Sequence, residues 1–180
     1  MTRLIPLLII ALILTAAILT ACAPTVSEER PDDFQAAYYW STGSLPPIYY
    51  YNYTITIGPE ETGTIVFRAG YNGEEAPVWT ETFPLEPGAL NVLYVSLYQA
   101  GAFTETWQQM EDTPDGGSVD SLDLTAYGTS YAIPSYIDGD DQARAMDAVY
   151  GMIEGFVPQE IWDDLYAKHE EYMIENEDEG

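Results

Sequence analysis

The chain has almost no cysteine, and the one that it has lies near its start. Cys22 is the single cysteine among 180 residues. The residues after it contain no thiol, which excludes a disulfide, a cysteine–metal site and a cysteine nucleophile from the folded part. The stability of that part must come from a hydrophobic core, and the chain is long enough for one domain of ordinary size.

Basic residues are nearly as scarce. Five Lys and Arg stand against 30 Asp and Glu, which gives a formal net charge of −25 at pH 7. Nucleic-acid binding needs clustered Lys and Arg to neutralise phosphates, so the composition predicts no nucleic-acid partner. Phosphorylated substrates are disfavoured for the same reason, and the negative field repels an anionic membrane surface. The simplest explanation of such acidity is solubility.

Residues 1–21 are predicted to be a signal peptide. Arg3 gives a weakly basic start, and residues 4–21 carry no charge and are mostly Leu, Ile and Ala. The ending Leu19-Thr20-Ala21-Cys22 resembles the lipobox of bacterial lipoproteins. That resemblance implies cleavage before Cys22 and lipid on its sulfur and on the new amino terminus. An uncleaved membrane-spanning helix is the alternative, because eighteen apolar residues just reach the usual length.

Both interpretations place the remaining chain outside the cytoplasm, held at the cell membrane or the outer membrane. The membrane partner is then the lipid on Cys22, and several acyl chains make such an anchor durable.

Residues 22–47 are predicted to be an acidic tether. This stretch has a proline near its start, a patch of acidic residues and a Pro-Pro pair at its end. Such a composition buries little surface and stays flexible or extended. Three adjacent aromatic residues interrupt it, Tyr38, Tyr39 and Trp40, and are expected to fold back on the domain.

The densest aromatic run, LPPIYYYNYTITI at residues 45–57, follows the two-residue period of a β-strand. Tyr49, Tyr51 and Tyr53 share one face with two isoleucines, whereas Tyr50 lies on the other face with polar residues. The tyrosines on the apolar face are expected in the core, with their hydroxyl groups reaching partners at the edge of the sheet. Tyr50 is expected outside.

The remaining periodicities predict an α+β domain over residues 48–173, followed by an acidic tail at 174–180. Alternation and turn signals predict further strands at 64–71, 78–83, 121–126 and 130–135. Helical spacing predicts a helix between Pro87 and Gly101, a second one ending at Phe156 and a third one starting at Pro158. The expected fold is an antiparallel sheet of about five strands, in the order three-strand meander, helix, hairpin and two C-terminal helices, with the helices on one face.

At this level the chain resembles a group of uncharacterised bacterial lipoproteins. The similarity is carried by an aromatic and proline-rich start, by PVWTETF before a helix, by the hairpin LTAYGTSYAIPSY and by the ending VPQEIWDDL. It covers roughly residues 46–165. It implies no activity and no functional residues, and it supports the architecture only.

The sequence contains no catalytic signature. His169 is the only histidine, which excludes a multi-histidine zinc site, and its place in an acidic terminal helix that is expected to fray makes it a poor general base. Glu81 lies between Trp79 and Phe83, and flanking aromatic rings can raise the pKa of a carboxyl group. Glu81 is therefore the candidate for an alternative function, a surface hydrolase that acts on glycans by carboxylate acid/base catalysis. A strand carboxylate more commonly points to solvent, or here pairs with Arg68 across the sheet.

Two oxygen-rich loops are weak candidates for calcium. Asp112 and Asp115 lie in the first, and Asp138 and Asp140 in the second. Carboxylate oxygens suit this cation outside cells, but neither loop matches the spacing of EF-hand ligands. Helix capping explains Asp140 more simply. No cofactor is expected.

Tyr38, Tyr39, Trp40 and Tyr50 remain as candidates for a partner-binding surface, because the predicted core does not obviously use them. Aromatic rings beside carboxylates suit a sugar or a protein partner, and simple packing of the tether on the sheet is the alternative. We therefore expect a lipid-anchored cell-envelope protein that is a non-enzymatic binding or scaffolding module for an envelope protein or glycan.

Overall fold

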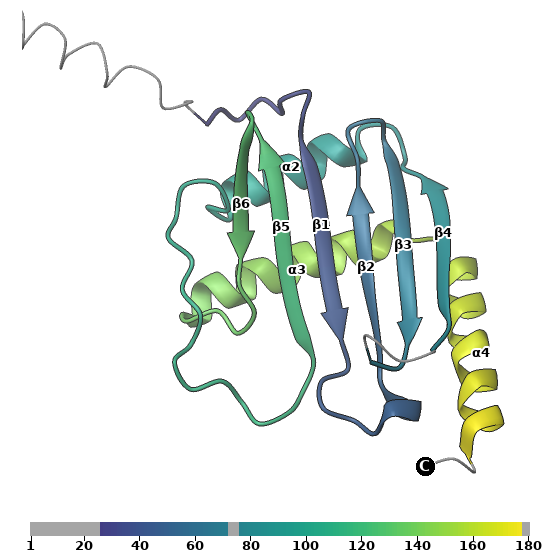
Figure 1. The fold of residues 1–180 in the computed structure, drawn as a ribbon. Coiled ribbons are helices and arrows are strands. Elements are labelled where there is room, and N and C mark those ends of the chain that lie inside the picture. The colour runs from purple at the N-terminus through teal and green to yellow at the C-terminus, as the bar shows by residue number, and fades with distance from the viewer. Residues whose placement is uncertain (1–25, 72–75, 178–180) are drawn as a thin grey trace, which may run out of the picture.

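An antiparallel sheet of six strands organises the part of the chain that the computed structural model describes, residues 26–71 and 76–177 (Figure 1). The strands are β1 (Gln35–Ser41), β2 (Tyr51–Ile57), β3 (Thr62–Ala69), β4 (Val78–Pro84), β5 (Val119–Ala126) and β6 (Thr129–Ile133). The helices are α2 (Ala89–Gln99), α3 (Asp140–Phe156), α4 (Gln159–Asn176) and a short 3-10 helix, η1 (Pro47–Tyr49). The predicted α+β class is confirmed, with one strand more than expected.

The strand order is β4-β3-β2-β1-β5-β6, and β1 lies in its middle. The predicted meander β2–β3–β4 and the predicted hairpin β5–β6 are both present. β1 pairs antiparallel with β2 on one side and with β5 on the other, so that it joins the two units into one sheet.

β1 shows that the prediction of a tether over residues 22–47 is wrong for residues 35–41. Ala36 and Tyr38 are fully buried on the core side of the strand. The sequence of β1 is a weak strand signal, because alanine is depleted in strands and three adjacent aromatic residues resemble a local cluster. Pairing along both edges of β1 decides its conformation, and that pairing involves partners far away in the sequence.

The segment before β1 is also fastened to the domain. The hydroxyl group of Tyr94 donates to the carbonyl oxygen of Ser27 at 2.6 Å, and that of Tyr127 donates to the carbonyl oxygen of Glu29 at 2.5 Å. Asp33 accepts from the backbone N–H groups of Tyr127 and Gly128, in the turn between β5 and β6. The chain therefore enters the domain at that turn and is held there from Ser27 onward.

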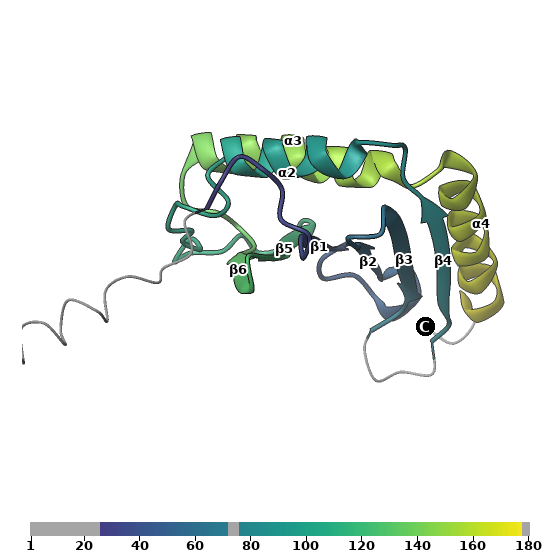
Figure 2. The same ribbon diagram turned by 90° about the horizontal axis from the view of Figure 1, so that it is seen from above.

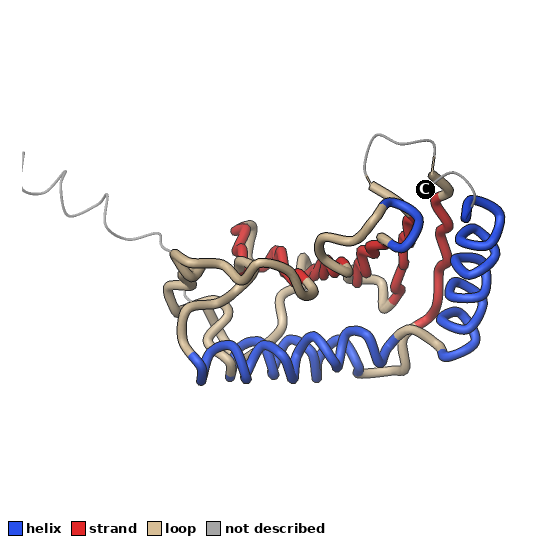
Figure 3. Tube along the Cα trace, turned by 90° about the horizontal axis from the view of Figure 1, so that it is seen from below, coloured by secondary structure: helices blue, strands red, loops and turns tan. Residues whose placement is uncertain are grey.

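The helices cover one face of the sheet, as predicted (Figures 2 and 3). α2 and α3 lie side by side across that face, and α4 turns away from α3 to run beside β4. The turn is at Val157, whose extended backbone is typical of a residue before proline, here Pro158. The buried side chains between the layers include Ile55, Ile57, Ile65, Phe67, Leu122, Leu90, Leu93, Leu97, Met146, Ile153 and Leu165.

The tyrosine run around β2 is only partly as predicted. Tyr53 is buried on the core face with Ile55 and Ile57, which confirms the alternation within the strand. Tyr49 lies before the strand in η1 and is 46% exposed, so its predicted place in the core is wrong. Tyr50 is buried although it was expected outside. The proline pair before η1 bends the chain here, and the strand begins at Tyr51.

The C-terminal helix is longer than predicted, and the predicted signal peptide lies outside the described residues. α4 continues to Asn176, so the helix extends three residues into the stretch predicted as an acidic tail, 174–180. The predicted signal peptide at 1–21 and Cys22 lie outside the described residues. Among the helices of the described part, none is long and apolar enough to cross a membrane.

The role of the N-terminal segment gives a first testable prediction. Phe34 is fully buried, with its ring edge-on to Tyr94 at 5.1 Å and to Phe103 at 6.5 Å. Phe34→Ala is expected to lower the free energy of unfolding by about 3–5 kcal/mol, since it removes a buried ring and leaves a cavity. The exposed neighbour Gln35 supplies the control, and Gln35→Ala is expected to change it by less than about 0.5 kcal/mol. Urea denaturation measures both, and equal small effects would show that this segment is a tether after all.

Candidate functional site

The four residues predicted to form an aromatic partner surface do not lie on one surface. Successive residues of a strand point to opposite faces, so β1 sends Tyr38 and Trp40 to the helix-covered face and Tyr39 to the other. Tyr38 is fully buried, and the ring of Trp40 stacks on that of Tyr53 at 5.1 Å. Tyr38 is therefore part of the core, and Trp40 is partly buried against it.

Tyr39 and Tyr50 do meet on the helix-free face. Their hydroxyl oxygens are 3.3 Å apart, and the ring of Tyr50 stacks on that of Tyr71 at 3.9 Å. The hydroxyl group of Tyr71 donates to the carbonyl oxygen of Leu45 at 2.7 Å. This cluster holds the chain around η1 against the end of the sheet, and Tyr50 is buried within it.

Glu81 has a cation beside it that the sequence did not reveal. Trp79, Glu81 and Phe83 share one face of β4, and that face is the helix-covered one. The carboxylate of Glu81 lies 3.8 Å from the amino group of Lys168 on α4, so the expected pairing with Arg68 is wrong. Arg68 lies on the opposite face of the sheet, because it faces Val78 in the register. Lys168 also pairs with Asp164 at 2.5 Å, so Glu81 belongs to a surface ion-pair network between β4 and α4.

The predicted calcium loops do not come together as a metal site. Asp112 and Asp115 are exposed in the connection between α2 and β5, whereas Asp138 and Asp140 are exposed at the start of α3. Within residues 26–71 and 76–177, no three carboxylate, histidine or cysteine side chains gather in a way that suits a metal ion. The N-cap of α3 is Gly139, so the predicted capping by Asp140 is wrong. Asp140 lies in the first turn, where its negative charge interacts favourably with the helix dipole.

His169 is part of the core instead of a catalytic group. It is 5% exposed on α4, and its ring contacts the rings of Tyr51 and Phe67 at 4.9 and 6.0 Å. Burial lowers the pKa of His169, so its imidazole is neutral at neutral pH.

The residues with the most distinctive environment form a pocket between β5, the segment after β6 and the start of α3. We call it the Asp120 pocket, and its cavity measures about 300 Å³. It is lined by Met110, Asp120, Pro134, Tyr136, Ile137, Asp140, Ala143, Asp147 and Tyr150. Three carboxylates and two phenol groups therefore meet a wall of apolar side chains.

Asp120 lies at the end of a chain of short hydrogen bonds that crosses the core. The hydroxyl group of Tyr38 donates to Asp120 Oδ1 at 2.5 Å and also lies 3.2 Å from Glu154 Oε1. The same oxygen of Glu154 accepts from the hydroxyl group of Tyr53 at 2.5 Å. Two carboxyl groups from β5 and α3 are thus held by two phenol groups from β1 and β2.

Burial raises the pKa of several groups in this hydrogen-bond network. Burial raises the pKa of Asp120, and the charges of Glu154 and Asp147 raise it further, against the hydrogen bond from Tyr38, which lowers it. Burial also raises the pKa of Tyr38 and of Tyr53 far above neutral pH. Both phenol groups therefore remain hydrogen-bond donors to the carboxyl groups.

Tyr150 supplies a hydroxyl group without a partner. The residue is 7% exposed, its ring stacks on that of Tyr38 at 4.9 Å, and its buried hydroxyl oxygen makes no hydrogen bond. Burial raises the pKa of Tyr150, and the negative charges of Asp120 and Asp147 add to this effect. A buried phenol group without a hydrogen bond is costly, and such a group in a pocket wall is a common sign of a binding site.

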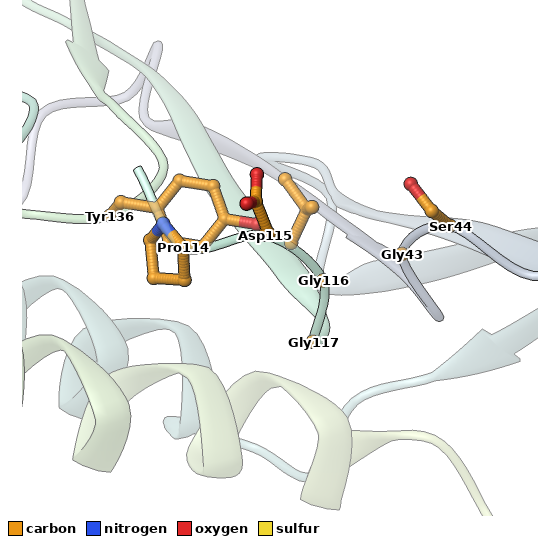
Figure 4. A pocket seen from close by; sticks show the side chains of 8 residues that line it. Gly43, Ser44, Pro114, Asp115, Gly116, Gly117 and Tyr136 are labelled. Carbon is orange, nitrogen blue, oxygen red and sulfur yellow. The ribbon is translucent and has the colours of Figure 1, made fainter. Parts of the chain in front are cut away.

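A second pocket adjoins the first, and the ring of Tyr136 belongs to both (Figure 4). Its cavity of about 420 Å³ lies between the loop after β1 and the loop before β5, with Ser44 and Asp115 on opposite sides. A Cβ atom on Gly43 would lie 1.9 Å from the carbonyl oxygen of Gly117, so the two loops touch backbone to backbone. Gly43 also has a positive φ of 77°, which glycine adopts most easily.

One signal in the sequence points to Asp120. Leu122 and Leu124 were expected to point inward, and extending the same alternation two residues back puts Asp120 on the core face as well. A carboxylate at a strand position that faces the core needs hydrogen-bond partners, so such a residue is a candidate functional residue. No local pattern marks Tyr150 or Asp147, because both look like ordinary positions of an amphipathic helix.

The raised pKa of Asp120 gives a prediction about pH. A carboxyl group with a raised pKa in the folded state stabilises the fold below its unfolded pKa of about 4, and this contribution is lost as the pH rises through the folded pKa. Asp120→Asn cannot ionise and keeps an acceptor for Tyr38. Its free energy of unfolding should therefore increase relative to that of the wild type as the pH rises from 4 to neutral. Urea denaturation of the full chain at several pH values measures the difference.

The control for this experiment lies on the same strand. Asp123 is exposed on the opposite face of β5, and Asp123→Asn removes the same charge from the molecule. Its difference from the wild type should vary little with pH over this range. Parallel pH profiles of the two variants would contradict the assignment of the raised pKa to Asp120.

No protein-family model matches this chain. A search of curated proteins likewise finds no significant match. The resemblance to uncharacterised bacterial lipoproteins therefore stays a prediction.

Proposed function

We propose that this chain is a lipid-anchored cell-envelope protein and works as a non-enzymatic binding or scaffolding module. The anchor is lipid on Cys22, and the folded domain faces outside the cytoplasm. Its ligand is a component of the envelope, a protein or a glycan, or a small molecule derived from one. The part of the domain that meets this ligand is the Asp120 pocket.

The observation that carries the proposal is the unpartnered hydroxyl group of Tyr150 in the Asp120 pocket. The same pocket is lined by Asp120, Asp140 and Asp147, and the carboxylate of Asp120 accepts a hydrogen bond from Tyr38. Small-molecule sites typically combine apolar walls with a few polar groups that fix the orientation of the ligand. The arrangement favours binding over turnover, because a nucleophile with its own base is not part of it and the single histidine lies in the core around Tyr51.

The position of the pocket in the fold supports presentation away from a membrane. The chain enters at the turn between β5 and β6, whereas Asp120 and Tyr136 lie at the other end of these strands (Figure 1). β5 has 8 residues, so the two ends are about 25 Å apart at roughly 3.3 Å per residue. Cys22 lies four residues before Val26, and four residues span at most about 14 Å. A lipid on Cys22 would hold the entry end near the bilayer and leave the pocket facing outward.

The anchor is tested by replacing its attachment point. Cys22→Ala is expected to abolish labelling by a palmitate analogue, because the sulfur that carries the acyl group is gone. Thr25→Ala lies three residues away and is the control, with labelling unchanged. A membrane-bound wild type that takes up no label would indicate a membrane-spanning helix in place of a lipid anchor.

The orientation is tested with a fluorophore at either end of the domain. Ser130→Cys places a thiol near the entry end, and Asp115→Cys places one near the pocket end, and both side chains are exposed. In vesicles that carry a quencher on the lipid headgroup, the label at position 130 should be quenched several-fold more strongly than the label at position 115. Equal quenching of the two labels would refute an outward-facing pocket while leaving the anchor intact.

A further inference from the structure

The chemistry of the Asp120 pocket selects the charge of its ligand. Asp120, Asp140 and Asp147 contribute carboxylates to its wall. Glu154 Oε1 lies 3.2 Å from the hydroxyl group of Tyr38, which donates to Asp120. An anionic ligand would meet repulsion from all of them, and a neutral one would gain nothing from their charge. A cation is the ligand whose charge this wall complements.

No basic side chain in the part of the chain that the structure describes lines this pocket. Four of the chain's five basic side chains lie in the described residues, and each is engaged or placed elsewhere. Arg30 donates to Asn91, and Lys168 pairs with Asp164 and Glu81. Arg68 lies on the helix-free face of the sheet. Arg144 is the nearest in sequence, but it pairs with Asp141, which is not in the pocket wall, and its side chain is 73% exposed.

The hydroxyl group of Tyr150 adds an independent argument. It is buried in the pocket wall and unpaired, and the neighbouring charges are those of Asp120 and Asp147. A phenol oxygen can accept a hydrogen bond from an N–H donor and at the same time donate to a carboxylate. A ligand with several N–H donors would therefore satisfy the phenol group and the carboxylates together.

The remaining wall argues for an organic ion over a metal ion. Met110, Ile137 and the ring of Tyr136 add apolar contacts to the lining of the same pocket. Carboxylates of the described residues do not form a metal-binding group here. A cavity of about 300 Å³ lies at the small end of the range for small-molecule sites.

We propose that the Asp120 pocket binds a small organic ammonium ion, with its nitrogen between Asp120, Asp147 and the hydroxyl group of Tyr150. Its carbon chain lies against Met110 and Ile137. This inference rests on the proposed function, because it names the ligand class of the same pocket. It also gives the unpaired hydroxyl group and the uncompensated carboxylates a common explanation.

The test uses n-butylammonium as the probe, with n-butanol and butyrate as probes of similar size and different charge. Nuclear magnetic resonance of the full chain in neutral detergent, at physiological salt, follows the signals of the pocket residues during titration. Butylammonium should shift these signals saturably, and butanol and butyrate should not. Asp147→Asn and Tyr150→Phe should each weaken binding by about tenfold, because each removes a hydrogen bond to a charged group.

Matched variants separate a site from general attraction to an acidic protein. Asp147 is exposed and Tyr150→Phe keeps the ring, so both variants should retain the fold. Asp123→Asn removes one charge on the opposite face of β5 and should leave binding unchanged. Equal weakening in Asp123→Asn and Asp147→Asn would overturn the proposed site.

The three probes also separate this inference from the proposed function. If butanol or butyrate shifts the same signals as strongly as butylammonium, the pocket binds small molecules but the ammonium assignment is wrong. If none of the three probes shifts them, the pocket is not a binding site, and the proposed function loses the observation that carries it.

Discussion

β1 makes backbone hydrogen bonds along both of its edges, and no other strand of the sheet joins the meander β2–β4 to the hairpin β5–β6. Without it, the chain would hold two small sheets, each with an open edge and half a core. The same strand carries Tyr38, whose hydroxyl group connects Asp120 on β5 with Glu154 on α3. The pairing of β1 therefore determines both the continuity of the core and the position of the pocket.

The sequence reveals the elements whose signals are local. Alternating residues predict β2 to β6, and helical spacing with Pro87, Gly101 and Pro158 predicts the three helices close to their observed bounds. β1 escapes prediction because its residues are alanines and adjacent aromatics between acidic and proline-rich stretches. Its strand partners lie near residues 55 and 122, and only the folded chain brings them together.

The candidate site is less predictable than the fold for a related reason. An acidic chain offers many carboxylates, and sequence alone cannot tell which one gains a cation. Glu81 looked isolated between two rings, yet Lys168 from a distant helix lies beside it. The predicted strand began at residue 121 and left Asp120 out, yet Asp120 lies in β5 and faces the core. The aromatic surface failed because Tyr38 and Tyr39 are neighbours in sequence and point to opposite faces.

The scarcity of basic residues explains why tyrosine is so prominent inside this domain. A buried carboxylate is usually balanced by Arg or Lys, but few of these are present to balance 30 acidic groups. Here phenol groups take over the role of donor, at Asp120 through Tyr38 and at Glu154 through Tyr53. A phenol group satisfies the hydrogen-bonding capacity of a carboxylate without neutralising its charge. Phenol donors to these partly buried carboxylates therefore leave negative charge at the wall of the pocket, and no basic side chain among the described residues lines that wall.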